Sequence, residues 1–347
     1  MLIRKPDYYD CFRCSMGACH DTCCAAWDIV IDEEHAAFYN NVPGELGERI
    51  RAALRKDEDG DLCFSVENGH CPLLTKERLC SIQLELGEEK VCDTCRSHPR
   101  FVEEYGSFRE MALAGSCPAA IELILSTDSG FETGTDEEAE FVCEDVDEEL
   151  LKALLPCRER AFEILERTEW NWKRRLTALL MFGSELQLAL LSEDQEGMIE
   201  LAAEWANADE SRLNIPDGDA DTARCRALKL LGELEVLDEN WAKDIAGASI
   251  GPKEKNLYLE DLERRWVQYL IWRWFLRADF DGDVYSKLAL PVLSILMLRE
   301  LSGGTDWMEW ARRWAKEVEH SAENRNALFD ALCTEEELAP DKLIGAL

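Results

Sequence analysis

Cysteines are the residues of this chain whose type and spacing could do chemistry. The sequence has 15 cysteines, and 11 of them lie in the first 117 of its 347 residues. One group falls in the stretch CFRCSMGACHDTCC at 11–24, and a second follows farther along, with Cys117 beyond it. The members are Cys11, Cys14, Cys19, Cys23 and Cys24, and then Cys71, Cys80, Cys92 and Cys95. Thiolates bind zinc and hold iron–sulfur clusters, and four of them complete either kind of site.

A cysteine cluster of this kind can be interpreted in four ways: as a disulfide knot, a metal cage, a redox pair, or buried small side chains. The start of the chain, MLIRKPDYYDCF, lacks the apolar stretch and the cleavage site of a secretory signal. We therefore expect a cytoplasmic protein, whose reducing surroundings disfavour structural disulfides. Cysteines that only fill a core would scatter along the chain. These cluster, which favours metal binding.

The residues leave the metal open between zinc and iron–sulfur. All-cysteine ligation fits either, and three of the five histidines lie beside these cysteines without zinc-finger spacing. Cys92-x-x-Cys95 has the spacing of metal ligands, although a lone CxxC is a weak signal. Adjacent Cys23 and Cys24 cannot easily both bind one ion, so at least one of them is expected to support the site. A redox role for either pair is disfavoured, because neither sits in a thioredoxin-like βαβ pattern.

The charge of the chain restricts its partners. With 38 basic and 72 acidic residues, the formal net charge is −34. Binding to nucleic acid or to an anionic membrane is disfavoured, because neutralising phosphates needs lysine and arginine. The longest apolar run, 288–298, is too short to span a bilayer and contains a proline, so we expect a buried helix there. A negative surface would attract a lysine-bearing protein.

The sequence predicts a mainly α protein with three parts. Residues 1–127 form a cysteine-rich, irregular metal-binding domain with short strands, 128–147 an acidic linker, and 148–347 an all-helical domain. In the first part we expect strands at 27–32 and 108–115. The expected helices there are one capped by Asp32, one over 44–56, and one that begins with a cap at Ser116 and Pro118.

Helical periodicity continues through the third part. The expected helices are 148–167, 170–192, 195–207, 221–246, 254–279, 284–302 and 306–331. The segment 262–280 has large aromatic side chains nearly all round, which is typical of a central helix in a bundle.

Several separated blocks of the first part resemble a known family. The blocks FRCSMGACHDTCCAAWDIVID, CPLL, LCSIQLELGEE, DTCRSHPR and SCPAA are similar, in order and spacing, to the flagellin lysine-N-methylase family. That family is related to the CxxCxxCC group of zinc- or iron-chelating proteins. The similarity covers about residues 8–125, whereas the helical remainder resembles the family only in length and character.

The resemblance implies an enzyme that transfers methyl groups from S-adenosylmethionine to surface lysines of bacterial flagellin or a similar protein. It also implies a [4Fe–4S] cluster held by the cysteines. The matching positions are Cys14, Cys19, Cys23, Cys24, Cys71, Cys80, Cys95 and Cys117. From these we expect Cys19, Cys23, Cys80 and Cys95 as the inner ligands, with Cys24 or Cys71 as replacements.

Arg100, in the block CRSHPR, is the expected contact to the carboxylate of the cofactor, with an ion pair to Glu103 or Glu104 as the alternative. The chain shows no glycine-rich turn within a βαβ unit, so a doubly wound nucleotide fold is not expected. A function of a different class stays open from the residues alone: a non-catalytic zinc- or iron-binding protein whose helices dock a partner.

Overall fold

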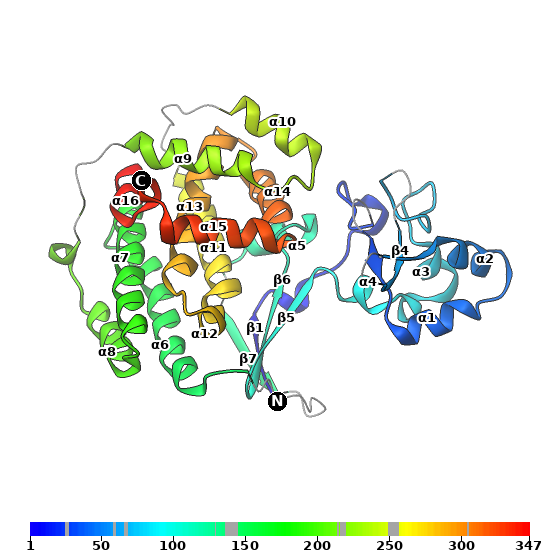
Figure 1. Ribbon diagram of the computed structural model, residues 1–347, viewed down its shortest axis with the longest axis horizontal. Helices are drawn as coiled ribbons and strands as arrows, with labels where there is room; N and C mark the ends of the chain where they lie inside the picture. Colours follow the sequence, from blue (N-terminus) through cyan, green and yellow to red (C-terminus); the bar gives the residue numbers. More distant parts are fainter. Residues whose placement is uncertain are drawn as a thin grey trace.

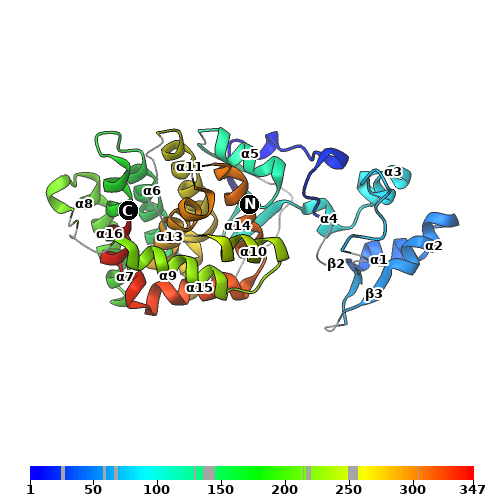
Figure 2. The ribbon, with the colours of Figure 1, turned by 90° about the horizontal axis from the view of Figure 1, so that it is seen from above.

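The computed structural model has two lobes, which Figures 1 and 2 show side by side from two directions. It describes residues 1–24, 28–57, 60–65, 69–128, 130–135, 145–213, 215, 220–248, 257–303 and 305–347. We call the described part of 28–97 the cysteine lobe. Residues 1–12 and the described part of 100–347 form the helical lobe. Residues 13–24, the junction segment, lie between the two lobes (dark blue in Figure 1).

Each lobe has its own hydrophobic core. The core of the cysteine lobe is small, with 13 buried residues between Ile29 and Cys92. The core of the helical lobe begins at Tyr8 and includes residues from almost every element after Tyr105. The predicted three-part division at residues 127 and 147 stays a prediction, and the predicted acidic linker lies partly outside the described residues.

The cysteine lobe is built from short elements around a three-stranded antiparallel sheet of order β2-β4-β3. Its elements are β2 (Ile29–Val30), α1 (Glu33–Asn40), α2 (Gly44–Ala53), β3 (Leu54–Lys56), β4 (Leu62–Phe64), α3 (Ser81–Leu86), the 3-10 turn η3 (Glu88–Lys90) and α4 (Asp93–Ser97). Asp32 caps α1 as predicted, since its carboxylate accepts the His35 amide. The helix predicted over 44–56 ends at Ala53, because residues 54–56 pair with β4 instead.

A mixed four-stranded sheet, of order β5-β6-β1-β7, joins the chain start to the helical lobe. Its strands are β1 (Leu2–Pro6), β5 (Arg100–Tyr105), β6 (Phe108–Leu113) and β7 (Phe131–Thr135). Strand β1 runs parallel to β6, with Leu2 opposite Phe108, and antiparallel to β7. The strand predicted over 108–115 is therefore confirmed as β6. Helix α5 (Pro118–Ser126) follows, with Cys117 at the cap position in place of the expected Ser116.

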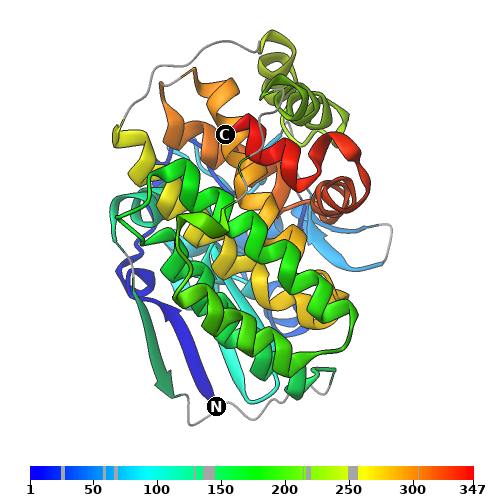
Figure 3. The same cartoon turned by 90° about the vertical axis from the view of Figure 1, so that its left-hand side faces the viewer.

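The rest of the helical lobe is helical, as predicted. Its elements are α6 (Glu148–Leu165), α7 (Trp172–Leu191), α8 (Gln195–Ala206), α9 (Ala220–Glu233), α10 (Glu239–Gly247), α11 (Leu257–Trp274), α12 (Ala278–Asp281), α13 (Tyr285–Ser302), α14 (Trp307–Glu319), α15 (Ala322–Thr334) and α16 (Pro340–Ala346). The green helices α6, α7 and α8 pack against one another on the side of the lobe that faces the viewer in Figure 3. Helix α13 contains the apolar run and is buried almost all round, so the buried-helix prediction is confirmed.

Three predicted helices are divided. The 3-10 turn η5 (Phe275–Arg277) separates α11 from α12 in the stretch 254–279, and the other two helices have non-helical breaks. The stretch 221–246 forms α9 and α10 with a break at 234–238, and 306–331 forms α14 and α15 with a break at His320 and Ser321. Both breaks have a cap that restarts the helix: Asp238 accepts the Asn240 amide and Ser321 accepts the Asn324 amide. No helix among the described residues combines the length and the apolar character that a membrane span needs.

Candidate metal centre

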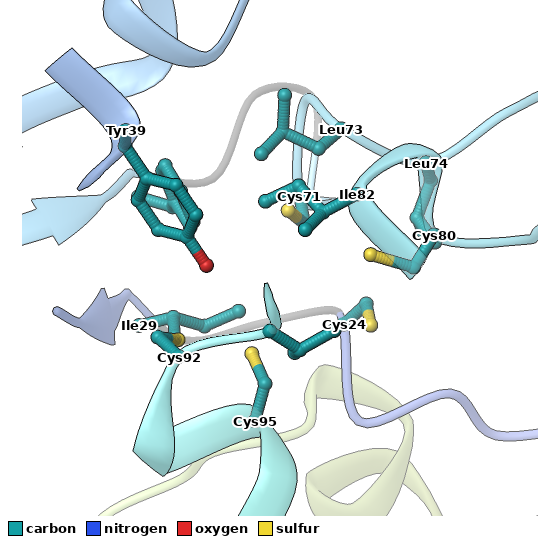
Figure 4. Close-up of a pocket in the computed structure, with 12 residues that line it drawn as sticks. Cys24, Ile29, Tyr39, Cys71, Leu73, Leu74, Cys80, Ile82, Cys92 and Cys95 are labelled. Atoms are coloured by element: carbon teal, nitrogen blue, oxygen red, sulfur yellow. The ribbon is translucent and has the colours of Figure 1, made fainter. Parts of the chain in front are cut away.

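Five cysteines surround one small cavity in the core of the cysteine lobe. Cys24, Cys71, Cys80, Cys92 and Cys95 line it together with Tyr39 and apolar side chains, and the cavity volume is about 20 Å³. Figure 4 shows the five cysteines placed around the cavity, with the sulfur atoms of Cys71, Cys80 and Cys95 facing its centre. That volume holds roughly one water-sized sphere. Residues from the junction segment to α4 therefore meet at a single point.

Backbone contacts bring the first three of these cysteines together. The Cys71 amide donates to the Cys24 carbonyl over 2.8 Å, which joins the end of the junction segment to the second cysteine group. Leu74 and Cys80 form an isolated antiparallel bridge, and this closes the loop between Cys71 and α3. Cys80 is the cap residue of α3, so its position is set where that helix begins.

Helix α4 supplies the other two thiols. Cys92 is its cap residue and is completely buried, and Cys95 lies three positions later. Residues three apart lie on the same face of a helix, so both sulfurs face the cavity. The sequence reasoning placed Cys92 in the second cysteine group but not among the expected ligands, because it is absent from the positions that match the family. Its CxxC spacing with Cys95 was the signal in the sequence, and the start of helix α4 between the two residues gives that spacing its structural meaning.

The protonation of the thiols follows from burial and from two close sulfur pairs. Burial raises the pKa of Cys71 to about 12 and also raises that of Cys80. The hydrogen bond between Cys92 and Cys95 lowers the pKa of Cys92 to about 7 and raises that of Cys95. The hydrogen bond that Cys24 shares with Cys23 likewise lowers the pKa of Cys24 to about 7. Two cavity thiols can thus become thiolates near neutral pH.

This donor set fits a soft or borderline cation. Every side-chain heteroatom of the residues that line the cavity belongs to a thiol or to Tyr39, whose hydroxyl donates to the Lys90 carbonyl. Among the described residues, those lining the cavity include no basic side chain that could neutralise buried thiolates. Buried charges need a counter-charge, and a metal bound to several sulfurs supplies it.

The other predicted ligands lie outside this cavity. Of the six cysteines proposed from the sequence, Cys24, Cys71, Cys80 and Cys95 line the cavity, whereas Cys19 and Cys23 lie in the junction segment. Cys23 still contacts Cys24 through the hydrogen bond of their thiols. Which cysteines bind metal stays a prediction.

Arg100 lines a second, open cleft on the far side of α4. The cleft has a volume of about 440 Å³, and Glu88, Asp93, Arg96 and Ser97 line it as well. The Arg100 guanidinium lies over the Phe12 ring, 5.1 Å from its centroid.

The two carboxylates considered as partners of Arg100 bond other arginines. Glu103 pairs with Arg273 and Arg277, and Glu104 accepts a hydrogen bond from Arg109. A binding role for Arg100 stays a prediction.

Comparison with known proteins supports the resemblance noted from the sequence. The chain is 28% identical over 132 residues to proteins named lysine-N-methylase from Salmonella typhimurium (strain LT2) and Salmonella choleraesuis (strain SC-B67). It is also 28% identical over 132 residues to the flagellar biosynthetic protein FliU of Salmonella muenchen. The expected similarity to lysine-N-methylases is therefore confirmed for part of the chain.

The coverage of these matches is partial. They include 36% of this chain, 33% of each lysine-N-methylase and 78% of FliU, so the chain matches about a third of the length of the lysine-N-methylases. No family model and no solved structure matches the chain.

Proposed function

We propose that this chain is a cytoplasmic protein-lysine N-methyltransferase. In this proposal it uses S-adenosylmethionine to modify flagellin or another protein with exposed lysines, and the thiols of the cysteine lobe hold a [4Fe–4S] cluster. The observation that carries the proposal is the similarity to proteins named lysine-N-methylase, together with the five thiols around one cavity. A thiolate cage of this kind is the usual protein ligand set of an iron–sulfur cluster.

The spread of the sulfur atoms supports a cluster over a single ion. A tetrahedral zinc site holds each sulfur about 2.3 Å from the metal, so its four sulfurs converge closely. Among the described residues, no three of the cavity sulfurs lie within 4.8 Å of one another. A cluster binds each thiolate at a different iron atom and therefore suits separated ligands. The cage also offers one thiol more than the four that a cluster needs.

The open cleft beside α4 is the proposed site of S-adenosylmethionine. Its volume of about 440 Å³ falls within the range of ordinary small-molecule sites. Arg96 and Arg100 offer guanidinium groups for the carboxylate of the cofactor, and Glu88 offers a carboxylate for its ammonium group. Helix α4 would then separate the two sites, because Cys95 lines the cavity while Arg96 and Ser97 line the cleft.

The residues of the cleft would orient the reactants. S-adenosylmethionine, when bound, supplies an electrophilic methyl group that the lysine amine attacks. Arg100 is held against the Phe12 ring, so it presents its donors from a fixed direction. The acidic surface of the chain, with its net charge of −34, would attract the lysine ammonium before it loses its proton.

Methyl transfer is the direct test of this function. Protein purified without oxygen is incubated with flagellin and S-adenosylmethionine labelled in the methyl group, and the label on lysine is measured by mass spectrometry. We expect label with the wild type, much less with Arg100→Ala, and the wild-type amount with Arg55→Ala. Arg55, in strand β3 of the cysteine lobe, is a suitable control because it does not line the cleft and its guanidinium donates to the nearby carbonyls of Ala52 and Leu54. An intact metal centre with no label on lysine would refute the proposal.

A second candidate is a non-catalytic zinc- or iron-binding protein. The observation in its favour is the cavity volume of about 20 Å³, which suits one ion better than a cluster. Metal and sulfide analysis separates the two candidates. One zinc per cysteine lobe without sulfide favours the binding protein, whereas about four irons with equal sulfide favours the cluster.

A further inference from the structure

Four cysteines of the first third remain grouped after the cavity is assigned its five. Cys14, Cys19 and Cys23 lie in the junction segment, and Cys117 caps helix α5 of the helical lobe. Ninety-three residues of sequence separate Cys23 from Cys117, so their proximity is a product of the fold and not of local spacing. Cys14 and Cys23 are exposed, and Cys19 and Cys117 are partly buried.

Ion pairs hold the junction segment against the helical lobe. The Asp21 carboxylate accepts a 2.6 Å hydrogen bond from Arg312 and bonds of 3.0 Å from Lys316, both on α14. Arg312 also donates to the carbonyl of Ser116, the residue before Cys117. One guanidinium therefore fixes the turn between Cys19 and Cys23 beside the start of α5. Burial alone would raise the pKa of Asp21, but the charges and hydrogen bonds of Lys316 and Arg312 lower it below its usual value.

The other side of the junction segment contacts the cysteine lobe. The turn η2 (Met16–Ala18) lies between Cys14 and Cys19, and at its centre Gly17 packs against Glu77 and Leu79. A side-chain carbon at Gly17 would come within 3.0 Å of the Glu77 carbonyl and 3.1 Å of Leu79, which explains the glycine. The segment is thus positioned from both lobes at once.

The fold brings the four thiols into one region of the molecule. Cys23 interacts electrostatically with Cys14 and with Cys117, and Cys117 does so with Cys19 and Cys14. Two of the thiols are oriented by local bonds: the Met16 amide donates to the Cys14 sulfur over 3.3 Å, and the Cys19 thiol donates to the Asp21 carbonyl over 3.2 Å. Each of these four described thiols is thus within electrostatic reach of at least one other, and no three of their sulfurs lie within 4.8 Å of one another.

The adjacent cysteines divide between the two groups. Cys24 lines the cavity of the cysteine lobe, whereas Cys23 interacts with the thiols of the junction. Two neighbouring thiols that cannot easily bind one ion can readily serve two sites. This division gives each member of the pair a distinct partner set.

We propose that Cys14, Cys19, Cys23 and Cys117 form a second thiolate metal centre, separate from the cavity of the cysteine lobe, which fastens the junction segment to helix α5. Its ligand is a soft or borderline metal held by four sulfurs, as a zinc ion or as an iron–sulfur cluster. Binding releases one proton for each thiol that enters as a thiolate. Because Cys23 and Cys24 are adjacent, each centre restrains the backbone that positions the other.

Metal analysis of paired variants tests this directly. The full chain is purified without oxygen as wild type, as C14S/C117S, as C71S/C80S, and as the control C225S/C333S, which removes two exposed thiols of the helical lobe. Zinc, iron and sulfide are then measured per chain. We expect each of the first two variants to lose one site's metal and keep the other's, and the control to keep both. The metal lost with C14S/C117S identifies the occupant as zinc or as a cluster.

Two results would overturn the proposal. If C14S/C117S retains all the metal of the wild type, the four thiols bind none. If either pair of substitutions removes all the metal, the nine thiols form a single centre.

A second measurement needs no variant that might fail to fold. In the metal-loaded wild type, iodoacetamide should modify exposed Cys14 and Cys23 far more slowly than exposed Cys225, as read by mass spectrometry of the peptides. Equal rates at these three cysteines would contradict a metal at the junction.

Discussion

Loss of the metal should unfold the cysteine lobe while the helical lobe stays folded. The lobe has about 70 residues, and a domain of that size seldom gains more than 3–5 kcal/mol from one hydrophobic core. Its core has only 13 buried residues, and two of them, Cys71 and Cys92, are candidate ligands. A structural metal contributes on the order of 10 kcal/mol to folding of such a unit. The metal therefore contributes more to folding than the hydrophobic core does, and without metal the cysteine lobe is only marginally stable.

Hydrogen exchange measured by mass spectrometry tests this prediction, because it reports the protection of backbone amides in each lobe separately. In C71S/C80S, amides of α1, α2 and β4 should lose most of their protection, whereas those of α7 and α13 keep theirs. Tryptophan fluorescence gives an independent check, because 10 of the 11 tryptophans lie at or beyond Trp170. The denaturation midpoint of C71S/C80S, followed by tryptophan fluorescence, should match that of C225S/C333S. Metal-free protein with full protection in α1 and α2 would refute the reasoning.

Three further predictions test the cleft, the core and the acid response. Arg100→Ala should weaken binding of S-adenosylmethionine by about 1.5–3 kcal/mol, which is the contribution of a hydrogen bond to a charged group. Calorimetric titration measures this change, and the control Arg55→Ala should bind as tightly as the wild type. Arg158 is fully buried and bonds both oxygens of Glu110 at 2.6 and 2.5 Å. Arg158→Met should therefore cost about 3–5 kcal/mol in urea unfolding, and adding Glu110→Leu should restore part of it; an unchanged midpoint would contradict this. Burial lowers the pKa of His98 and His320 to about 4. The unfolded chain then binds more protons below pH 6.5, and stability should fall as the pH drops from about 6.5 towards 4. His320→Gln should make the free energy of unfolding less dependent on pH in this range, and an unchanged dependence would contradict the role of His320.

The sequence was sufficient for features set by local chemistry. The Asp32 cap, strand β6 and the buried helix α13 follow from a capping residue, an alternating pattern and an apolar run. The helix breaks at 234–238 and at His320 were missed because helical periodicity continues across them. What ends each helix is a new cap, and the second break is also fixed by the bond between Ser116 and His320, residues far apart in the chain.

The grouping of the thiols could be predicted only in part. Clustering in the sequence indicated a metal site, and four of the six proposed ligands do meet at one cavity. The separation of Cys23 from Cys24, and the approach of Cys117 to the junction segment, depend on long-range contacts. The Arg312 bonds to Asp21 and Ser116 are such contacts, and spacing along the chain gives no sign of them.

X-ray absorption at the metal edge, combined with sulfide analysis of the anaerobically purified chain, tests the thiol-held cluster most directly. The account predicts iron with an all-sulfur first shell, a second shell of neighbouring iron, and sulfide equal to the iron of each cluster. Substituting Cys71 and Cys80 should remove the cluster of the cysteine lobe. A chain that contains only isolated zinc ions with sulfur at about 2.3 Å, or one whose metal has mainly nitrogen and oxygen ligands, would contradict it.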